Sequence, residues 1–190
     1  PRNEFCCNTM VVVSSTPMST DFPLLVGAGP LPELKMRQAC EALARACRCP
    51  LTSVDIGASP TEILQNRPAA TGLVRLCGDA ARPTTQGDAS WLQSLADWRQ
   101  SLLLLTPADS DGSIPGTAPA YAALCRELHV PLLGLVQIEG IWNGAARRRD
   151  GLSWLGWIPN DQHPDQADCL DALARRLRQH TPPTRPQLQS

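Results

Sequence analysis

The sequence predicts an α/β protein with a doubly wound, mainly parallel sheet of about five or six strands and helices on both faces. Three observations indicate this fold class: short apolar runs recur, segments with a helical apolar period lie between them, and turn residues separate the two. Strands that are apolar on both faces are typical of a parallel sheet covered on both sides. Right-handed crossovers between such strands then place helices on each face.

The first three strands are expected in the first half of the chain. Apolar runs over residues 22–26, 51–56 and 73–77 are bounded by Gly, Pro or Asp, which is typical of short buried strands. A helix is expected over residues 32–48, because its apolar residues recur at steps of four, three and four and a proline follows its end. One or two helical turns are expected over residues 61–66.

The next helix is predicted by a cap and an apolar face. Asp88 or Ser90 offers a side-chain oxygen to the first amides of a helix. The apolar residues on one face of that helix are Trp91, Leu92, Leu95 and Trp98. A clear buried strand is expected over residues 102–105, directly after this helix.

The last elements follow the same rules. An amphipathic helix is expected over residues 117–128, and strands over residues 131–136 and 154–158 lie on either side of a polar loop over residues 139–150. The arginine run at residues 147–149 belongs to that loop and is expected to be solvated, although it could also bind a phosphate or carboxylate. The apolar positions that mark a closing helix are Leu170, Leu173, Ala174 and Leu177.

The composition is ordinary for a globular protein and excludes several classes. The 190 residues carry 17 Lys and Arg against 18 Asp and Glu, a formal charge of −1, and 43% of them are hydrophobic. A chain of this length buries roughly 70% of the surface of its unfolded form, so we expect the core to need no disulfide or metal. The balanced charge argues against nucleic-acid binding, and no apolar run approaches the roughly 18 residues of a membrane span.

The two ends lack a sustained apolar pattern. Residues 1–20 combine a short valine run with Ser, Thr and Pro, and residues 181–190 hold three prolines, which remove helix continuity and backbone donors. We therefore expect a disordered N-terminal segment over residues 1–20, a single α/β domain over residues 21–180 and a disordered tail over residues 181–190. Met18 is a candidate native start.

Glycine and polar residues follow several expected strands. In an open α/β sheet, ligands bind outside the carboxyl ends of the strands, where the strand order switches. Glycines there can admit an anion to a helix N-terminus, and carboxylates can bind magnesium or act as a base. The candidate ligand-binding residues are Gly27, Gly29, Asp55, Asp79, Asp109, Ser113 and Gln137. Each also has a structural explanation, because glycines form tight turns and aspartates bond to the backbone of their own turn.

No pattern assigns a catalytic residue, a metal ligand or a cofactor. No Gly-x-Ser-x-Gly turn occurs. The cysteines are spread over separate elements, where a free cysteine behaves as a small hydrophobe, and Cys47 and Cys49 lack a second pair at zinc spacing. A thiol-based or metal-binding function would need three of them to converge. With no signal-peptide pattern, this indicates a reduced, cytoplasmic protein.

The second half of the chain carries an ordered set of motifs. The apolar strand SLLLLT at residues 101–106 is followed by a Gly-Ser-Ile loop, a helix, VPLLGLV at residues 130–136 and GLSWLGWIP at residues 151–159. In this order, residues 98–159 resemble the carboxyl-terminal half of dethiobiotin synthetases and related P-loop ATPases. The resemblance implies a P-loop-NTPase-like form of the doubly wound fold, with the last motif beside a nucleotide base.

The phosphate-binding loop of that family does not occur in the first half. The loop needs Gly-x-x-x-x-Gly-Lys-Ser/Thr, whose amides and lysine surround the phosphates. Counted from Gly27, its last three places hold Pro32, Glu33 and Leu34. The proline removes an amide, and the glutamate would bring an anion to the phosphates without a compensating lysine. Lys35 lies two positions beyond and is expected to point about 160° away on a helix.

The sequence therefore predicts a P-loop-like protein that lacks the phosphate loop and acts as a binding, regulatory or assembly protein. Its partner would be another protein or a small anionic ligand at the strand ends. The alternative is a small-molecule enzyme, ligase- or hydrolase-like, that uses Asp79 and Asp109. A deep crevice that gathers these carboxylates would favour the enzyme, whereas a shallow one capped by tryptophans would favour an interaction protein.

Overall fold

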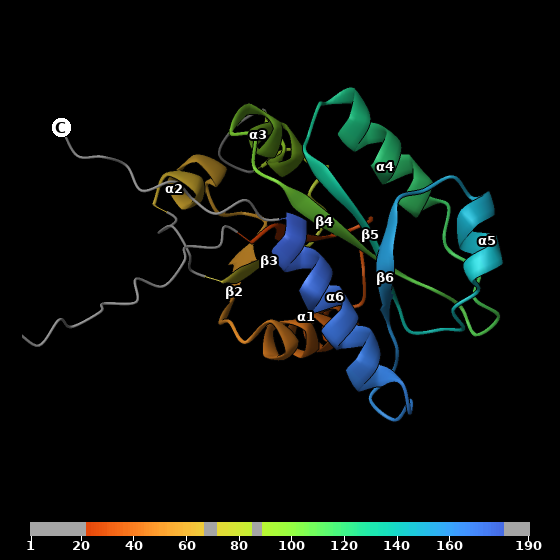
Figure 1. Cartoon of the computed structure of the whole chain (residues 1–190). Coiled ribbons are helices and arrows are strands. Elements are labelled where there is room, and N and C mark those ends of the chain that lie inside the picture. Colours follow the sequence, from red (N-terminus) through yellow and green to blue (C-terminus); the bar gives the residue numbers. More distant parts are fainter. Residues whose placement is uncertain (1–21, 67–71, 85–88, 181–190) are drawn as a thin grey trace, which may run out of the picture.

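Six parallel strands form the centre of the computed structural model, which describes residues 22–66, 72–84 and 89–180 (Figure 1). The strands are β1 (Leu24–Gly27), β2 (Leu51–Asp55), β3 (Leu73–Cys77), β4 (Leu102–Pro107), β5 (Leu132–Ile138) and β6 (Trp154–Ile158). Their order is β2-β3-β1-β4-β5-β6, and every neighbouring pair is parallel. This confirms the predicted sheet, with six strands.

Helices cover both faces of the sheet, as the sequence predicts. The helices of the described residues are α1 (Glu33–Cys47), α2 (Pro60–Gln65), α3 (Trp91–Asp97), α4 (Thr117–Glu127), α5 (Gly144–Arg149) and α6 (Gln166–His180). In Figure 1, α1 and α6 lie together on one face, and α2, α3 and α4 lie on the other. No described helix has the length and apolarity that a membrane crossing requires.

The core consists of two apolar layers that share the strands. Successive residues of β4 alternate between these layers, because side chains of a strand point to opposite faces. Leu103 and Leu105 pack with α1 and α6, whereas Leu102 and Leu104 pack with α3 and α4, and all four are fully buried. Burial of one such leucine contributes about 1.5–3 kcal/mol, which explains why β4 is a continuous apolar run.

The chain changes direction in the sheet at β1. From β1 it passes through α1 to the edge strand β2, and from β3 it passes through α3, on the other face, to β4. The loop after β1 and the loops after β3 and β4 therefore leave toward opposite faces. This is the switch of strand order at which the sequence predicts a ligand site.

Local sequence signals place the helix starts well. Pro32 stands at the N-cap of α1, one residue before the helix begins. At α3, the Ser90 hydroxyl accepts from the Gln93 amide at 3.2 Å, and the Gln93 side chain accepts from the Ser90 amide at 2.8 Å. This reciprocal capping box satisfies two amides at the end of the helix. The other candidate cap, Asp88, lies outside the described residues, as do the predicted disordered ends.

Two expectations about the second half are wrong. The stretch over residues 139–150 is not a polar loop throughout, because α5 forms within it and the Asn143 side chain accepts from the Ala146 amide at 3.0 Å. Such a short helix has no complete apolar period to reveal it. Trp98 is 45% exposed rather than part of the apolar face, because it stands at the C-cap, after the last helical residue.

The arginine run is also not simply solvated. Arg147 is 6% exposed and donates from Nη2 to the Gly112 carbonyl at 2.8 Å. Its guanidinium lies 4.8 Å from the centre of the Trp154 ring, and its Nε lies 3.6 Å from an Asp150 carboxylate oxygen. The sequence could not show that α5 turns the first arginine of the run toward the protein.

Candidate functional site

Two backbone amides of the turn after β1 are already hydrogen-bonded within the protein. The Ala28 amide donates to the Leu105 carbonyl at 2.8 Å, and the Gly29 amide donates to the Gly27 carbonyl at 2.9 Å. The two prolines of the turn carry no amide hydrogen. Gly29 has φ 96°, and a Cβ there would lie 3.2 Å from the Thr117 side chain at the start of α4. The Ala28 and Gly29 amides are therefore occupied, and Gly29 packs against the start of α4, at the place where a phosphate loop would present free amides.

Glu33 has a partner in the protein. Its Oε1 lies 2.6 Å from Nη1 of Arg75, which is on β3 and only 4% exposed. The Arg75 Nε also donates to the Ser53 hydroxyl at 3.1 Å. The Glu33 carboxylate therefore neutralises a buried guanidinium, a partner on β3 that the sequence did not reveal. An unpaired buried charge would cost several kcal/mol.

Asp55 and Asp79 are held within their own surroundings. Asp55 ends the edge strand β2, and its Oδ1 accepts from the Gly57 amide at 2.7 Å, as in a simple aspartate turn. Asp79 accepts from the Ala81 amide at 3.1 Å and from the Tyr121 hydroxyl. Its Oδ2 lies 3.4 Å from Nε of Arg82. Both aspartates therefore match their structural explanation.

The contact with Asp79 also influences the protonation state of the Tyr121 hydroxyl. Burial raises the pKa of the Tyr121 hydroxyl, and its hydrogen bond to Asp79 and the negative charge of that carboxylate raise it further. The hydroxyl therefore stays protonated at neutral pH and acts as a donor. It positions the loop after β3 against α4 rather than supplying a base.

Asp109 and Ser113 close a small loop after β4. The Ser113 hydroxyl donates to Asp109 Oδ2 at 3.3 Å, and the Asp109 amide donates to the Ser113 carbonyl at 2.9 Å. The Ser113 amide donates to Asp111 Oδ1 at 2.9 Å, and this bond, followed by the Ser113 side chain, lowers the pKa of Asp111. These two predicted site residues thus lie together, with the Asp109 carboxylate at the surface.

Gln137 is fully buried near the end of β5. Its Nε2 donates to the carbonyl oxygens of Glu139 at 2.8 Å and Ile141 at 3.3 Å. Its Oε1 has no hydrogen-bond partner among the described residues. The side chain therefore holds the loop after β5 in place and is itself out of reach of a ligand.

The larger opening at the strand ends lies beside β4, β5 and β6, which we name the β4–β6 groove. It has a volume of about 920 Å³ and is lined from the loops after these strands and from the first turn of α1. The lining side chains with polar or aromatic groups include Lys35, Asp109, Glu139, Trp142, Trp157, Asn160, His163 and Asp165. Of the predicted site residues, only Asp109 lines it.

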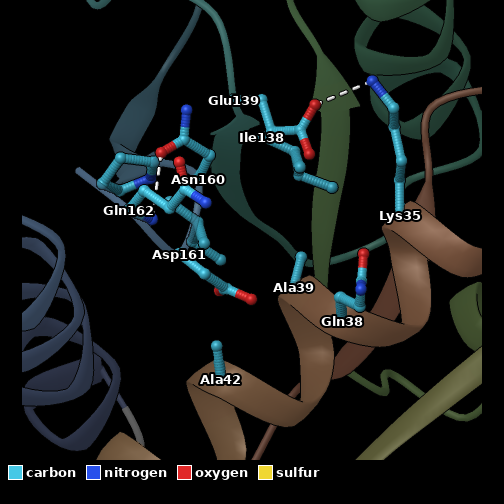
Figure 2. A pocket seen from close by; sticks show the side chains of 11 residues that line it. Lys35, Gln38, Ala39, Ala42, Ile138, Glu139, Asn160, Asp161 and Gln162 are labelled. Carbon is cyan, nitrogen blue, oxygen red and sulfur yellow. Dashed lines mark hydrogen bonds and ion pairs between the residues drawn. The ribbon is translucent and has the colours of Figure 1, made fainter.

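A second cavity of about 290 Å³ adjoins the groove and shares Lys35, Glu139 and Asn160 with it. Figure 2 shows Lys35 reaching from α1 toward Glu139, with Asp161 on the opposite wall. The Lys35 Nζ and Glu139 Oε2 atoms are 2.7 Å apart. Lys35 therefore lines the groove, and its ion pair with Glu139 joins α1 to the loop after β5.

The wall of the groove is built from two loops pressed against each other. Glu139 and Gly140 have φ 55° and 62°, and a Cβ on Gly140 would lie 2.5 Å from the Asp109 carbonyl oxygen. A Cβ on Gly112 would lie equally close to the Ile141 carbonyl oxygen. Left-handed backbone at a non-glycine residue costs free energy, and other contacts must maintain it.

Trp157 supplies one of these contacts. Its Nε1 donates to the Glu139 carbonyl at 2.9 Å, and its ring lies edge-on to His163 with centres 4.9 Å apart. Trp157 is not among the site residues predicted from the sequence, because its role depends on the meeting of β6 with the loop after β5. The aromatic and charged lining can be recognised only once the strand ends are placed side by side.

The described cysteines and acidic groups offer no alternative centre. The six cysteines of the described part form no disulfide, and burial raises the pKa of Cys40 and Cys47 to about 12 and that of Cys125 to about 11. These thiols stay protonated at neutral pH and are poor nucleophiles. Within the described ranges, no three His, Cys, Asp or Glu residues are grouped as a metal site would need.

Comparison with solved structures gives a likeness at low sequence identity. No protein-family model matches the sequence, and no curated protein matches it. Among solved structures, a chain of the MinC:MinD cell division protein complex of Aquifex aeolicus is similar, with 9% sequence identity and a TM-score of 0.47. The match covers 86% of this chain and 98% of that one.

Proposed function

We propose that this chain is a P-loop-like α/β protein without a working phosphate loop, and that it binds a partner at the β4–β6 groove. The observation that carries the proposal is the turn after β1, where the amides of Ala28 and Gly29 are already bonded and two residues are prolines. A phosphate is held by several free amides together with a lysine. In this turn two amides are already used, two residues have no amide hydrogen, and residues 28–32 include no lysine.

The groove supports a binding role better than the enzyme alternative. The enzyme reading requires Asp79 and Asp109 in one crevice, but Asp79 is tied to Tyr121 and Arg82, and only Asp109 lines the groove. The groove is instead open and lined by Trp142 and Trp157. By the criterion derived from the sequence, a tryptophan-lined groove that does not gather both Asp79 and Asp109 favours an interaction protein.

The rigidity of the wall also favours recognition. Gln137, Trp157 and the Lys35 ion pair all fix the loop that starts at Glu139. A surface that is already ordered loses less conformational entropy when a partner binds. The same proposal includes three further expectations from the sequence. The protein is dethiobiotin synthetase-like, it is located in the cytoplasm, and its binding has a regulatory or assembly role.

Calorimetric titration with nucleotides tests the proposal. The full chain is titrated with ATP, ADP and GTP, each with and without magnesium. We expect no binding tighter than about 100 μM, which corresponds to roughly 5.5 kcal/mol. Binding above that strength by any of these nucleotides would contradict the proposal, because the crevice would then accept phosphates by another route.

A further inference from the structure

We infer that the β4–β6 groove takes an arginine side chain from an extended segment of a partner protein. The guanidinium group would bind the carboxylates of Asp109 and Asp165 and lie against the indole ring of Trp142 or Trp157. This inference rests on the proposed function, since it names the chemistry of the partner at the same groove.

The charge of the groove favours a cationic ligand. The groove and its adjoining cavity are lined by four carboxylates, those of Asp109, Glu139, Asp161 and Asp165, against the single ammonium group of Lys35. That ammonium group is already paired with Glu139 at 2.7 Å. The whole chain has a formal charge of only −1, so the acidic excess is a local feature of this surface.

Two of the carboxylates retain free acceptor capacity. Among the described residues, the Asp109 carboxylate accepts only from the Ser113 hydroxyl, at 3.3 Å, and the Asp165 carboxylate makes no hydrogen bond or ion pair. Both residues are exposed. A cationic donor would therefore form new charge-assisted hydrogen bonds here without breaking an existing ion pair.

The aromatic lining distinguishes a guanidinium from other cations. Trp142 and Trp157 are half-buried, with one ring edge-on to Trp154 at 6.0 Å and the other edge-on to His163 at 4.9 Å. A planar guanidinium can stack on an indole and bond a carboxylate at the same time, whereas an ammonium group cannot match both geometries. A bare metal ion would not stack on the indole rings in this way.

One layer deeper, the protein already places a guanidinium beside an indole ring and near a carboxylate. The Arg147 guanidinium lies 4.8 Å from the centre of the Trp154 ring while its Nε faces Asp150 at 3.6 Å. Trp154 in turn contacts Trp142, which lines the groove. An arginine from a partner would therefore repeat, on the open side of this aromatic pair, an arrangement that the chain already contains.

The size and rim of the groove favour a segment over a free small cation. About 920 Å³ is near the upper end of the range for ligand pockets and exceeds the volume of one side chain. Ile141 lies on the rim and is 61% exposed, so residues that flank the arginine would find an apolar contact. A nucleic acid would instead bring phosphates to an acidic surface, which is unfavourable.

The test uses short peptides of alternating glycine with arginine, lysine or glutamate, titrated into the full chain by calorimetry. We expect the arginine peptide to bind most tightly, the lysine peptide more weakly, and the glutamate peptide not at all. Raising the salt concentration from about 50 mM to about 200 mM should weaken the binding of the arginine peptide, because the groove is open to solvent and salt screens its charges. Equal binding of the arginine and glutamate peptides would overturn the inference.

Charge-removing variants locate the site. The double variant Asp109→Asn with Asp165→Asn should bind the arginine peptide about tenfold more weakly, as expected for loss of two charged acceptors. The matched control is Asp97→Asn with Asp171→Asn, which removes the same charge from exposed residues outside the groove lining and should bind within about twofold of the unmodified chain. Equal weakening by both pairs would assign the effect to net charge and overturn the groove as the site.

A further variant guards against a folding effect. Asp165→Asn alone removes a carboxylate without described side-chain bonds, so it should leave the thermal midpoint unchanged and still weaken the arginine peptide. If neither the arginine peptide nor any nucleotide binds, the ligand class is wrong while the proposed absence of a phosphate site stands. If a nucleotide binds, the proposed function itself fails.

Discussion

Gln137 illustrates how one buried polar residue orders a surface. It is fully buried, yet its amide group supplies hydrogen bonds to the carbonyls of Glu139 and Ile141, both of which line the β4–β6 groove. Without these donors the two carbonyls would have to find water or other partners. From the sequence, Gln137 is a candidate ligand contact because it lies near the end of a strand. In the structure, its buried amide group positions the loop after β5.

Replacing Gln137 should therefore destabilise the protein. We expect Gln137→Leu to lower the free energy of unfolding by about 1–3 kcal/mol, because two hydrogen bonds to backbone carbonyls are lost. Urea denaturation measures this change. The control is Gln38→Leu on the exposed side of α1, which should stay within about 0.5 kcal/mol of the unmodified chain. Equal stability of Gln137→Leu and the unmodified chain would show that the loop does not depend on this side chain.

Three glycines separate backbone strain from steric clash. Gly140 has φ 62° and a Cβ there would meet the Asp109 carbonyl, Gly151 has φ 69° with open space, and Gly116 has ordinary φ with open space. We predict that alanine costs about 2 kcal/mol or more at Gly140, about 1 kcal/mol at Gly151 and less than about 0.5 kcal/mol at Gly116. Thermal denaturation of the three variants gives this order. A Gly140→Ala protein as stable as Gly116→Ala would refute the tight contact between the loops.

At the scale of elements, the boundaries that depend on local signals were predictable. The five-residue strands β3 and β6 match the predicted ranges, and the Ser90 cap starts α3 as expected. The elements that depend on tertiary contacts were not. The short helix α5 has no apolar period of its own, and Arg147 is buried only because α5 packs it against Trp154.

The buried thiol of Cys125 in α4 makes the free energy of unfolding depend on pH in the alkaline range. Burial raises the pKa of Cys125 from 9.0 to about 11, so between these values the unfolded chain loses a proton that the folded chain keeps. The unfolded state then binds fewer protons, and stability falls as pH rises through this window, by up to about 1.4 kcal/mol per pH unit from this group.

A variant isolates this contribution. Cys125→Ala should lose less stability between about pH 9 and pH 11 than the unmodified chain does, because one titrating group is gone while the cost of the removed sulfur is the same at every pH. Urea denaturation at several pH values measures both slopes. Ser94→Ala, at a buried residue that does not titrate, serves as the control and should run parallel to the unmodified chain. Parallel curves for Cys125→Ala would disprove the shifted thiol.

At the scale of the whole molecule, the fold class was predictable and the site was not. Apolar strands and amphipathic helices reveal the layers, because burial on two faces leaves a clear pattern in the sequence. The groove is assembled from α1 and three loops that are far apart along the chain. Asp109 was selected because it directly follows a strand, whereas Lys35 and Trp157 reach the same place only through the strand order.

The central claim is that this fold binds at the β4–β6 groove and not at the turn after β1. Parallel calorimetric titrations of the full chain with magnesium ATP and with the arginine peptide test it most directly. We expect heat of binding with the peptide and none with the nucleotide at affinities tighter than about 100 μM. Heat with magnesium ATP and none with the peptide would contradict it, and would return the search to the crevice beside β1.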